Sequence, residues 1–118
     1  MAGDKRRSAR LVPILSDEEV VMIESAKGGA SLAKILDISD GGVLTYVVES
    51  RAKLETGTAC KASFYHKGRV FAVQSKVTRN HWRMIGLEFT NVTPRLASQI
   101  RAKIASLEES FMKPKADS

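Results

Sequence analysis

The sequence predicts a mainly β fold, a small antiparallel β-barrel of six or seven strands followed by one amphipathic C-terminal helix. Short runs rich in β-branched residues recur between turn residues over 11–89, as in small barrels and sandwiches. After Thr93 the spacing of apolar residues changes to that of a helix. With 118 residues, the chain has room for one domain with one core and little for a second.

The expected strands are short and closely spaced. They cover residues 20–23, 30–38, 43–48, 58–65, 70–77 and 82–89. His66-Lys67-Gly68-Arg69 resembles a tight hairpin between two of them, in which Gly68 would supply a positive φ without steric cost. Thr78-Arg79-Asn80 is expected to lead from the fifth of these strands into the last.

The helix is expected to begin at Thr93-Pro94, with threonine as N-cap and proline at the first helical position. Spacings of three and four residues place on one face Leu96, Ile100, Ile104, Leu107 and Phe111, and mostly on the other Arg95, Arg101, Lys103, Glu108 and Glu109. We expect the apolar face to pack over an open end or face of the barrel, ahead of a dimerisation or effector-docking role. Lys113-Pro114 is expected to end the helix.

The chain divides into a flexible basic N-terminal arm (1–10), the barrel with its helix (11–112) and a frayed tail (113–118). The formal net charge is +6, and the arm holds half of that excess, because Lys5, Arg6, Arg7 and Arg10 face only Asp4. A localised basic arm favours an anionic partner. A single cysteine excludes an intrachain disulfide, and no apolar run is long enough to span a membrane, so the sequence indicates a cytoplasmic protein.

The residues that usually carry catalysis or bind metal form no constellation. Cys60 lies in a strand-like run and is expected to be a small buried side chain. His66 and His81 have no Cys, His or carboxylate at metal-ligand spacing, and no nucleophile elbow or phosphate-binding glycine loop occurs. We therefore expect no enzyme activity, no metal and no cofactor.

The first of two short motifs is Arg-x-x-x-Arg, from Arg6 to Arg10. Residues four apart in an extended segment project to the same side, so both guanidinium groups could hold one ligand of dinucleotide size. Guanidinium groups make two-point contacts with phosphate oxygens or with the O6 and N7 acceptors of guanine.

The second motif is Asp-x-Ser-x-x-Gly, from Asp37 through Ser39 to Gly42. Asp37 and Ser39 share a side if strand geometry persists, and a carboxylate can accept the N–H donors on a guanine edge. Gly41 and Gly42 would let the backbone turn sharply and approach a base closely. The alternative is an ordinary turn whose side chains bond their own backbone.

Together, in this order, the two motifs resemble the signature of the PilZ domain family, which binds the bacterial second messenger cyclic di-GMP. Residues 85–89 are also similar to the closing strand of that family, so the resemblance covers about residues 5–105. It implies that Arg6 and Arg10 clasp the dinucleotide from a flexible arm, while Asp37, Ser39 and Gly42 form the facing site. Lys5, Arg7 and Gly41 are further candidates.

The favoured hypothesis is a stand-alone PilZ-type receptor whose arm closes on cyclic di-GMP and signals to a downstream protein effector. The alternative is a PilZ-fold adaptor in motility or secretion that binds no nucleotide. The presence of both intact motifs argues against this alternative. A third hypothesis, a barrel that binds nucleic acid through its basic arm, is disfavoured because only seven aromatic residues occur and most are expected in the core.

Overall fold

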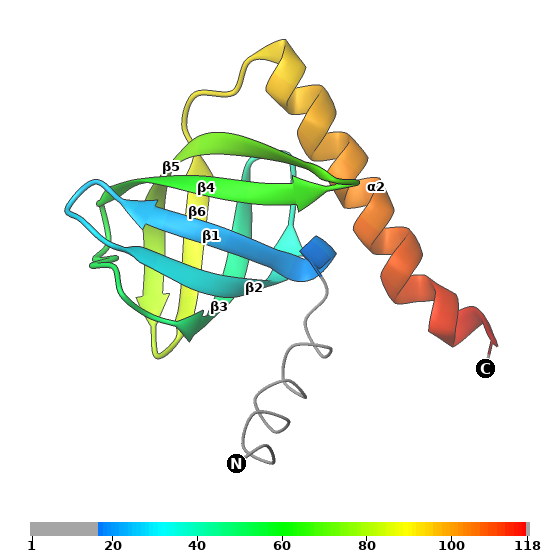
Figure 1. The fold of residues 1–118 in the computed structure, drawn as a ribbon, viewed down its shortest axis with the longest axis horizontal. Helices are drawn as coiled ribbons and strands as arrows, with labels where there is room; N and C mark the ends of the chain where they lie inside the picture. Colours follow the sequence, from blue (N-terminus) through cyan, green and yellow to red (C-terminus); the bar gives the residue numbers. More distant parts are fainter. Residues whose placement is uncertain (1–16, 118) are drawn as a thin grey trace.

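The structure, a computed structural model, describes residues 17–117 of the chain. Its elements are η1 (Asp17–Glu19), β1 (Val20–Ser25), β2 (Ala30–Ile38), β3 (Gly42–Glu49), β4 (Ala59–His66), β5 (Arg69–His81), β6 (Met84–Phe89) and α2 (Pro94–Asp117). The described strands close into an antiparallel barrel in the order β1-β2-β3-β6-β5-β4 (Figure 1). The predicted fold class is confirmed, with six strands. The predicted arm, with Lys5, Arg6, Arg7 and Arg10, lies outside the described residues.

The barrel core is built mainly by alternation along the strands. On β1, Val21 and Ile23 have no exposed surface and Met22 between them is exposed. On β5, Val73, Ser75 and Val77 are buried, and the two residues between them are exposed. Phe64 on β4 packs against Phe71 at a ring-centroid distance of 5.4 Å. Because β-strand side chains alternate between faces, this pattern leaves a second, outer face for solvent and ligands. Cys60 is buried, as expected.

The β4–β5 hairpin has the predicted two-residue turn. Lys67 and Gly68 both have positive φ, 50° and 81°, which is the backbone of a type I′ turn. His66 pairs with Arg69 directly across it. The expected role of Gly68 is confirmed.

The boundary between the last two strands differs from the prediction. β5 continues through Thr78-Arg79-Asn80 to His81, and Trp82, expected in β6, lies in the turn. The register shifts between Val77 and Arg79, so one extra residue breaks the alternation of apolar and polar side chains. The alternation of apolar and polar residues that predicted the strand ends at the bulge, whereas the strand itself continues to His81.

Helix α2 begins as predicted, since Pro94 is its first residue and the Thr93 hydroxyl accepts the Leu96 N–H at 3.2 Å. Ile100 and Leu107 are buried, and Leu96 and Ile104 pack against the barrel core. The helix therefore packs on the barrel, crossing its end beside β4 (Figure 1). The side chain of Phe111 lies outside the described residues.

Two expectations about α2 are wrong. Lys103, placed on the polar face, has no exposed surface. It lies three residues after Ile100 and four before Leu107, so it shares their face, and a long aliphatic stem can be buried while its ammonium group reaches a polar site. The helix also runs past Lys113-Pro114 to Asp117, because a proline so near the end removes only one late backbone hydrogen bond.

Within residues 17–117, no helix has both the length and the apolar composition that crossing a bilayer requires.

Candidate functional site

The pairing of strands brings four residues into one row on the outer face of the barrel. Asp37 on β2 pairs with Leu44 on β3, Leu44 pairs with Gly86 on β6, and Gly86 pairs with Arg79 on β5. Asp37 and Arg79 are exposed. Because paired residues in a sheet point to the same face, an acidic and a basic side chain stand at the two ends of this row.

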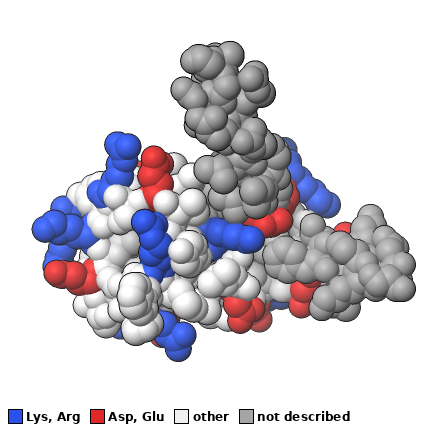
Figure 2. Space-filling model, turned by 90° about the horizontal axis from the view of Figure 1, so that it is seen from below, with Lys and Arg blue, Asp and Glu red and all other residues white. Residues whose placement is uncertain are grey.

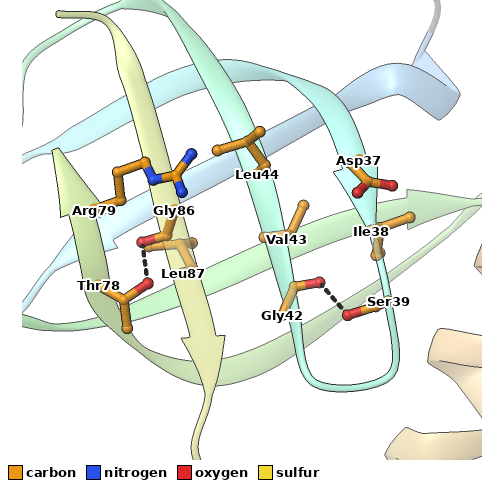
Figure 3. A pocket seen from close by; sticks show the side chains of 10 residues that line it. All are labelled: Asp37, Ile38, Ser39, Gly42, Val43, Leu44, Thr78, Arg79, Gly86 and Leu87. Atoms are coloured by element: carbon orange, nitrogen blue, oxygen red, sulfur yellow. Dashed lines mark hydrogen bonds between the residues drawn. The ribbon is translucent and has the colours of Figure 1, made fainter. Parts of the chain in front are cut away.

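A hollow of about 260 Å³ lies over this row. Its lining residues come from four strands and one turn: Asp37, Ile38, Ser39, Gly42, Val43, Leu44, Thr78, Arg79, Gly86 and Leu87. Figure 3 shows Asp37 and Arg79 on opposite sides of it, with Leu44 and Gly86 between them. A side chain on Gly86 would place its Cβ 3.1 Å from that of Arg79, so this glycine keeps the middle of the row open.

The β2–β3 turn forms one border of the hollow. The Ser39 N–H donates to the Gly42 carbonyl at 2.9 Å, and the Ser39 hydroxyl accepts the Gly41 N–H at 3.3 Å. A longer contact, 3.5 Å, joins the same hydroxyl to the Gly42 carbonyl. The backbone-bonded turn weighed as an alternative is therefore present, and Ser39 still lines the hollow. Its hydroxyl retains capacity for one further partner.

The two glycines of the motif differ in how closely other atoms approach them. Neither has a positive φ, and a Cβ on Gly41 would meet no atom within 4 Å. A Cβ on Gly42 would lie 2.3 Å from the Leu87 carbonyl oxygen of β6. Gly42 is thus required by the close approach of β3 to β6. The chain does turn between Ile38 and Gly42, with the Ser39 bonds across the turn, and it does so without a positive φ at either glycine.

The charged groups of the hollow are available to a ligand. No hydrogen bond or ion pair joins the side chain of Asp37 or Arg79 to another described residue. A guanidinium group offers a planar fork of donors and a carboxylate offers acceptors only. The hollow can therefore recognise a polar ligand that carries both acceptor and donor edges.

The family follows from a comparison with known domains. The model of the PilZ domain family matches residues 4–106, most of the chain. The chain belongs to the PilZ domain family. No curated protein matches it at a significant level.

Solved PilZ domains share this fold. The chain is similar to the PilZ domain with c-di-GMP of YcgR from Escherichia coli, with a TM-score of 0.66 and 20% identity over 84% of this chain and 87% of that one. It is similar to the PilZ domain of CeSA from a cellulose-synthesizing bacterium, with a TM-score of 0.63 and 18% identity over 75% and 91%. YcgR in complex with c-di-GMP gives 0.61 and 22%, over 83% of this chain and 45% of that one.

Arg79 is the residue of this PilZ domain's hollow that the sequence analysis missed. It was assigned to a connection, and the bulge after Val77 hides that it points to the outer face of a strand. A weak signal exists in the sequence, since Arg79 is basic and the facing strand carries a glycine, Gly86. That signal can be recognised only when the register between β5 and β6 is known.

A second charged cluster lies where η1, α2 and the β4–β5 hairpin meet. The ammonium group of Lys103 donates to the backbone carbonyls of Glu18 and Tyr65 and to Glu18 Oε1, the last at 3.1 Å. Glu18 Oε2 accepts the Lys67 N–H at 3.1 Å. Lys103 thus ties the first described element to the C-terminal helix.

Burial and pairing act in opposite directions in this cluster. Burial lowers the pKa of Lys103, and its bond and attraction to Glu18 oppose that change. Burial tends to raise the pKa of Glu18, but the bonds from Lys67 and Lys103 outweigh it, so this pKa lies below its usual range. His66 Nδ1, 3.7 Å from Glu18 Oε1, is buried and has no hydrogen-bond partner within residues 17–117.

The other candidates of the sequence analysis show no such assembly. Among the described residues, no three His, Cys, Asp or Glu side chains gather closely enough to hold a metal ion. Burial raises the pKa of the Cys60 thiol to about 11, which keeps it protonated and unreactive at neutral pH.

Proposed function

We propose that this PilZ domain is a receptor for cyclic di-GMP and that the ligand binds over the row from Asp37 to Arg79. The observation that carries the proposal is the hollow, in which both motif side chains, Asp37 and Ser39, face a cation from a distant strand. The similar PilZ domain of YcgR, whose structure includes c-di-GMP, supports the choice of ligand.

The chemistry of each group matches a part of that ligand. The Asp37 carboxylate accepts the N–H donors of one guanine, and the Ser39 hydroxyl adds a bond to the same base. The Arg79 guanidinium takes a phosphate oxygen pair or the O6 and N7 acceptors of a guanine. Gly86 leaves space for a flat base against Leu44. The role is binding without a chemical step.

The motif arginines Arg6 and Arg10 would complete the site from the N-terminal arm. Charge-assisted bonds to phosphate offset the entropy lost when a flexible segment is ordered. Arm closure would then change the surface offered to a protein effector. Asp37 also lines a smaller hollow of about 100 Å³ between β2 and α2, so a ligand at Asp37 lies beside the C-terminal helix.

The proposal is tested by calorimetric titration of the folded protein with cyclic di-GMP, with GMP and cyclic di-AMP as controls. Heat of binding confined to cyclic di-GMP supports a receptor, and the stoichiometry distinguishes one ligand from a stacked pair. No heat from a protein shown to be folded would refute the receptor and leave a nucleotide-free adaptor.

Two variants test the site itself. Arg10→Ala and Asp37→Ala should each weaken binding by about 1–3 kcal/mol while the denaturant midpoint stays close to that of the wild type. Unchanged affinity in both would overturn the assignment of these residues even if the ligand binds.

A further inference from the structure

The tip of the β5–β6 hairpin presents the chain's single tryptophan to solvent. Trp82 is 87% exposed, although tryptophan is a residue that folding usually buries in large part. His81 pairs with Met84, so the turn consists of Trp82 and Arg83. Trp82 has φ 61°, and positive φ at the first position of a two-residue turn favours glycine. The exposed indole therefore occupies a strained backbone position.

This tip is held in place by the strands behind it. Arg83 Nη1 donates to the Val47 carbonyl at 2.8 Å and to that of Val48 at 3.3 Å, and the Val47 N–H donates to the Arg83 carbonyl at 2.7 Å. The Asn80 amide donates to the Leu54 carbonyl at 2.8 Å. The indole thus projects from a well-anchored hairpin. Strain at a well-anchored, solvent-facing position points to a function for the side chain.

The hairpin that carries the tip is basic. Residues 56–87, which include all of β4 and β5, contain no Asp or Glu. Arg79 and Arg83 flank Trp82 on the hairpin. The neighbouring end of β3, which Arg83 contacts, carries Glu49, and this residue forms an ion pair with Arg51 at 3.7 Å. Figure 2 shows the lower side of the barrel, where both basic and acidic side chains project around an uncharged area.

We propose that the β5–β6 tip docks on an anionic lipid surface. The indole would enter the headgroup region, where tryptophan is favoured. Exposed Arg83 would contact a lipid phosphate through the guanidinium N–H groups that do not bond to Val47 and Val48. A convex tip with one aromatic side chain and half-exposed Val48 beside it fits a surface that deforms around it. A stable protein interface needs about 800 Å² of complementary surface on each partner, so a two-residue turn fits a lipid surface better than a protein partner. Arg79 also lines the hollow proposed for cyclic di-GMP, so the lipid proposal rests on Trp82 and Arg83 and does not require that ligand.

The test uses Trp82 as its own probe. The whole protein is titrated with phosphatidylglycerol–phosphatidylcholine vesicles, and with pure phosphatidylcholine vesicles as control. We expect the tryptophan emission to shift to shorter wavelength with the anionic vesicles alone, and the shift to weaken as salt is raised. An unchanged emission spectrum at millimolar anionic lipid would overturn the proposal.

Two matched variants locate the contact by co-sedimentation with the same vesicles. Trp82→Gly removes the indole and relieves the positive φ, so the variant should fold and lose most of its sedimentation. Val70→Ser removes an apolar side chain that is 67% exposed beside the other basic hairpin, and should sediment like the wild type. Equal sedimentation of Trp82→Gly and wild type, or equal loss in both variants, would overturn the proposal and favour diffuse charge attraction.

Discussion

Two charged regions of this barrel use the same kinds of side chain in opposite ways. In the outer hollow, Asp37 and Arg79 are exposed and have no partner among the described residues. At the junction of η1 and α2, Lys103 is fully buried and bonded to two carbonyls and a carboxylate. Asp37 and Arg79 lie on opposite sides of an open hollow, whereas the Lys103 contacts join η1 to α2.

The difference shows what each region can do. A buried charge must be paired because its transfer from water is costly, so the Lys103 contacts are needed to hold the fold. An exposed charge without a partner costs little and leaves its bonding capacity to a ligand. Changes at the junction should therefore alter stability, and changes in the hollow should alter binding.

The largest effect is expected from Lys103→Met. The variant keeps an apolar stem but removes the donor from Glu18 and Tyr65, so the free energy of unfolding should fall by about 3 kcal/mol. The measurement is urea unfolding followed by circular dichroism.

Lys61→Met is the control for this variant. Lys61 forms an exposed ion pair with Glu24 at 3.1 Å, and its loss should cost less than about 1 kcal/mol. Equal losses in the two variants would mean that burial of Lys103 has no structural importance.

The next effect separates the two glycines of the turn. Gly42→Ala forces a Cβ against the Leu87 carbonyl, so β3 or β6 must shift, and stability should fall by about 1–3 kcal/mol. Gly41→Ala meets open space and should leave the thermal midpoint nearly unchanged. If Gly41→Ala is the more harmful change, the close approach of β3 to β6 is not what requires glycine.

In the hollow, Arg79→Gln should act on binding alone. Loss of its charge should weaken cyclic di-GMP binding by about 1–3 kcal/mol, while stability changes by less than about 0.5 kcal/mol. Arg69→Gln, at the other end of β5, is the matched control and should bind as the wild type does. Calorimetry measures both variants, and a similar loss for Arg69→Gln would indicate long-range attraction by net charge.

The smallest effect is a pH dependence at the junction. The pKa of Glu18 is lower in the folded state than its usual value, so its ionised form stabilises the fold above that usual value. This contribution is lost as pH falls through the folded-state pKa. The stability difference between wild type and Glu18→Gln should therefore be greatest near neutral pH and shrink in acid. A difference that stays constant from pH 7 to acid pH would contradict the role of the carboxylate.

Where a residue's role depends on its neighbours in sequence, the role could be predicted without the structure. Gly68 in its hairpin, Thr93 as N-cap, and the apolar spacing from Leu96 to Leu107 were all predicted and are confirmed. The motif side chains Asp37 and Ser39 line the same hollow, although Ser39 lies beyond the end of β2.

Roles that depend on contacts between distant segments could not be predicted from the sequence. The bulge after Val77 hid Arg79, and Lys103 was assigned to solvent because its three bonding partners lie in η1 and β4. The limit on side-chain size at Gly42 is likewise set by a distant segment, the Leu87 carbonyl of β6.

The sequence by itself determined the fold class, the family signature and the turn chemistry, because these follow from residue type and short-range spacing. The tertiary structure alone decided which charges are buried and paired and which remain open to a ligand. The physical reason is that strand register and helix packing set the surroundings of each charge, and its surroundings determine whether it stabilises the fold or binds.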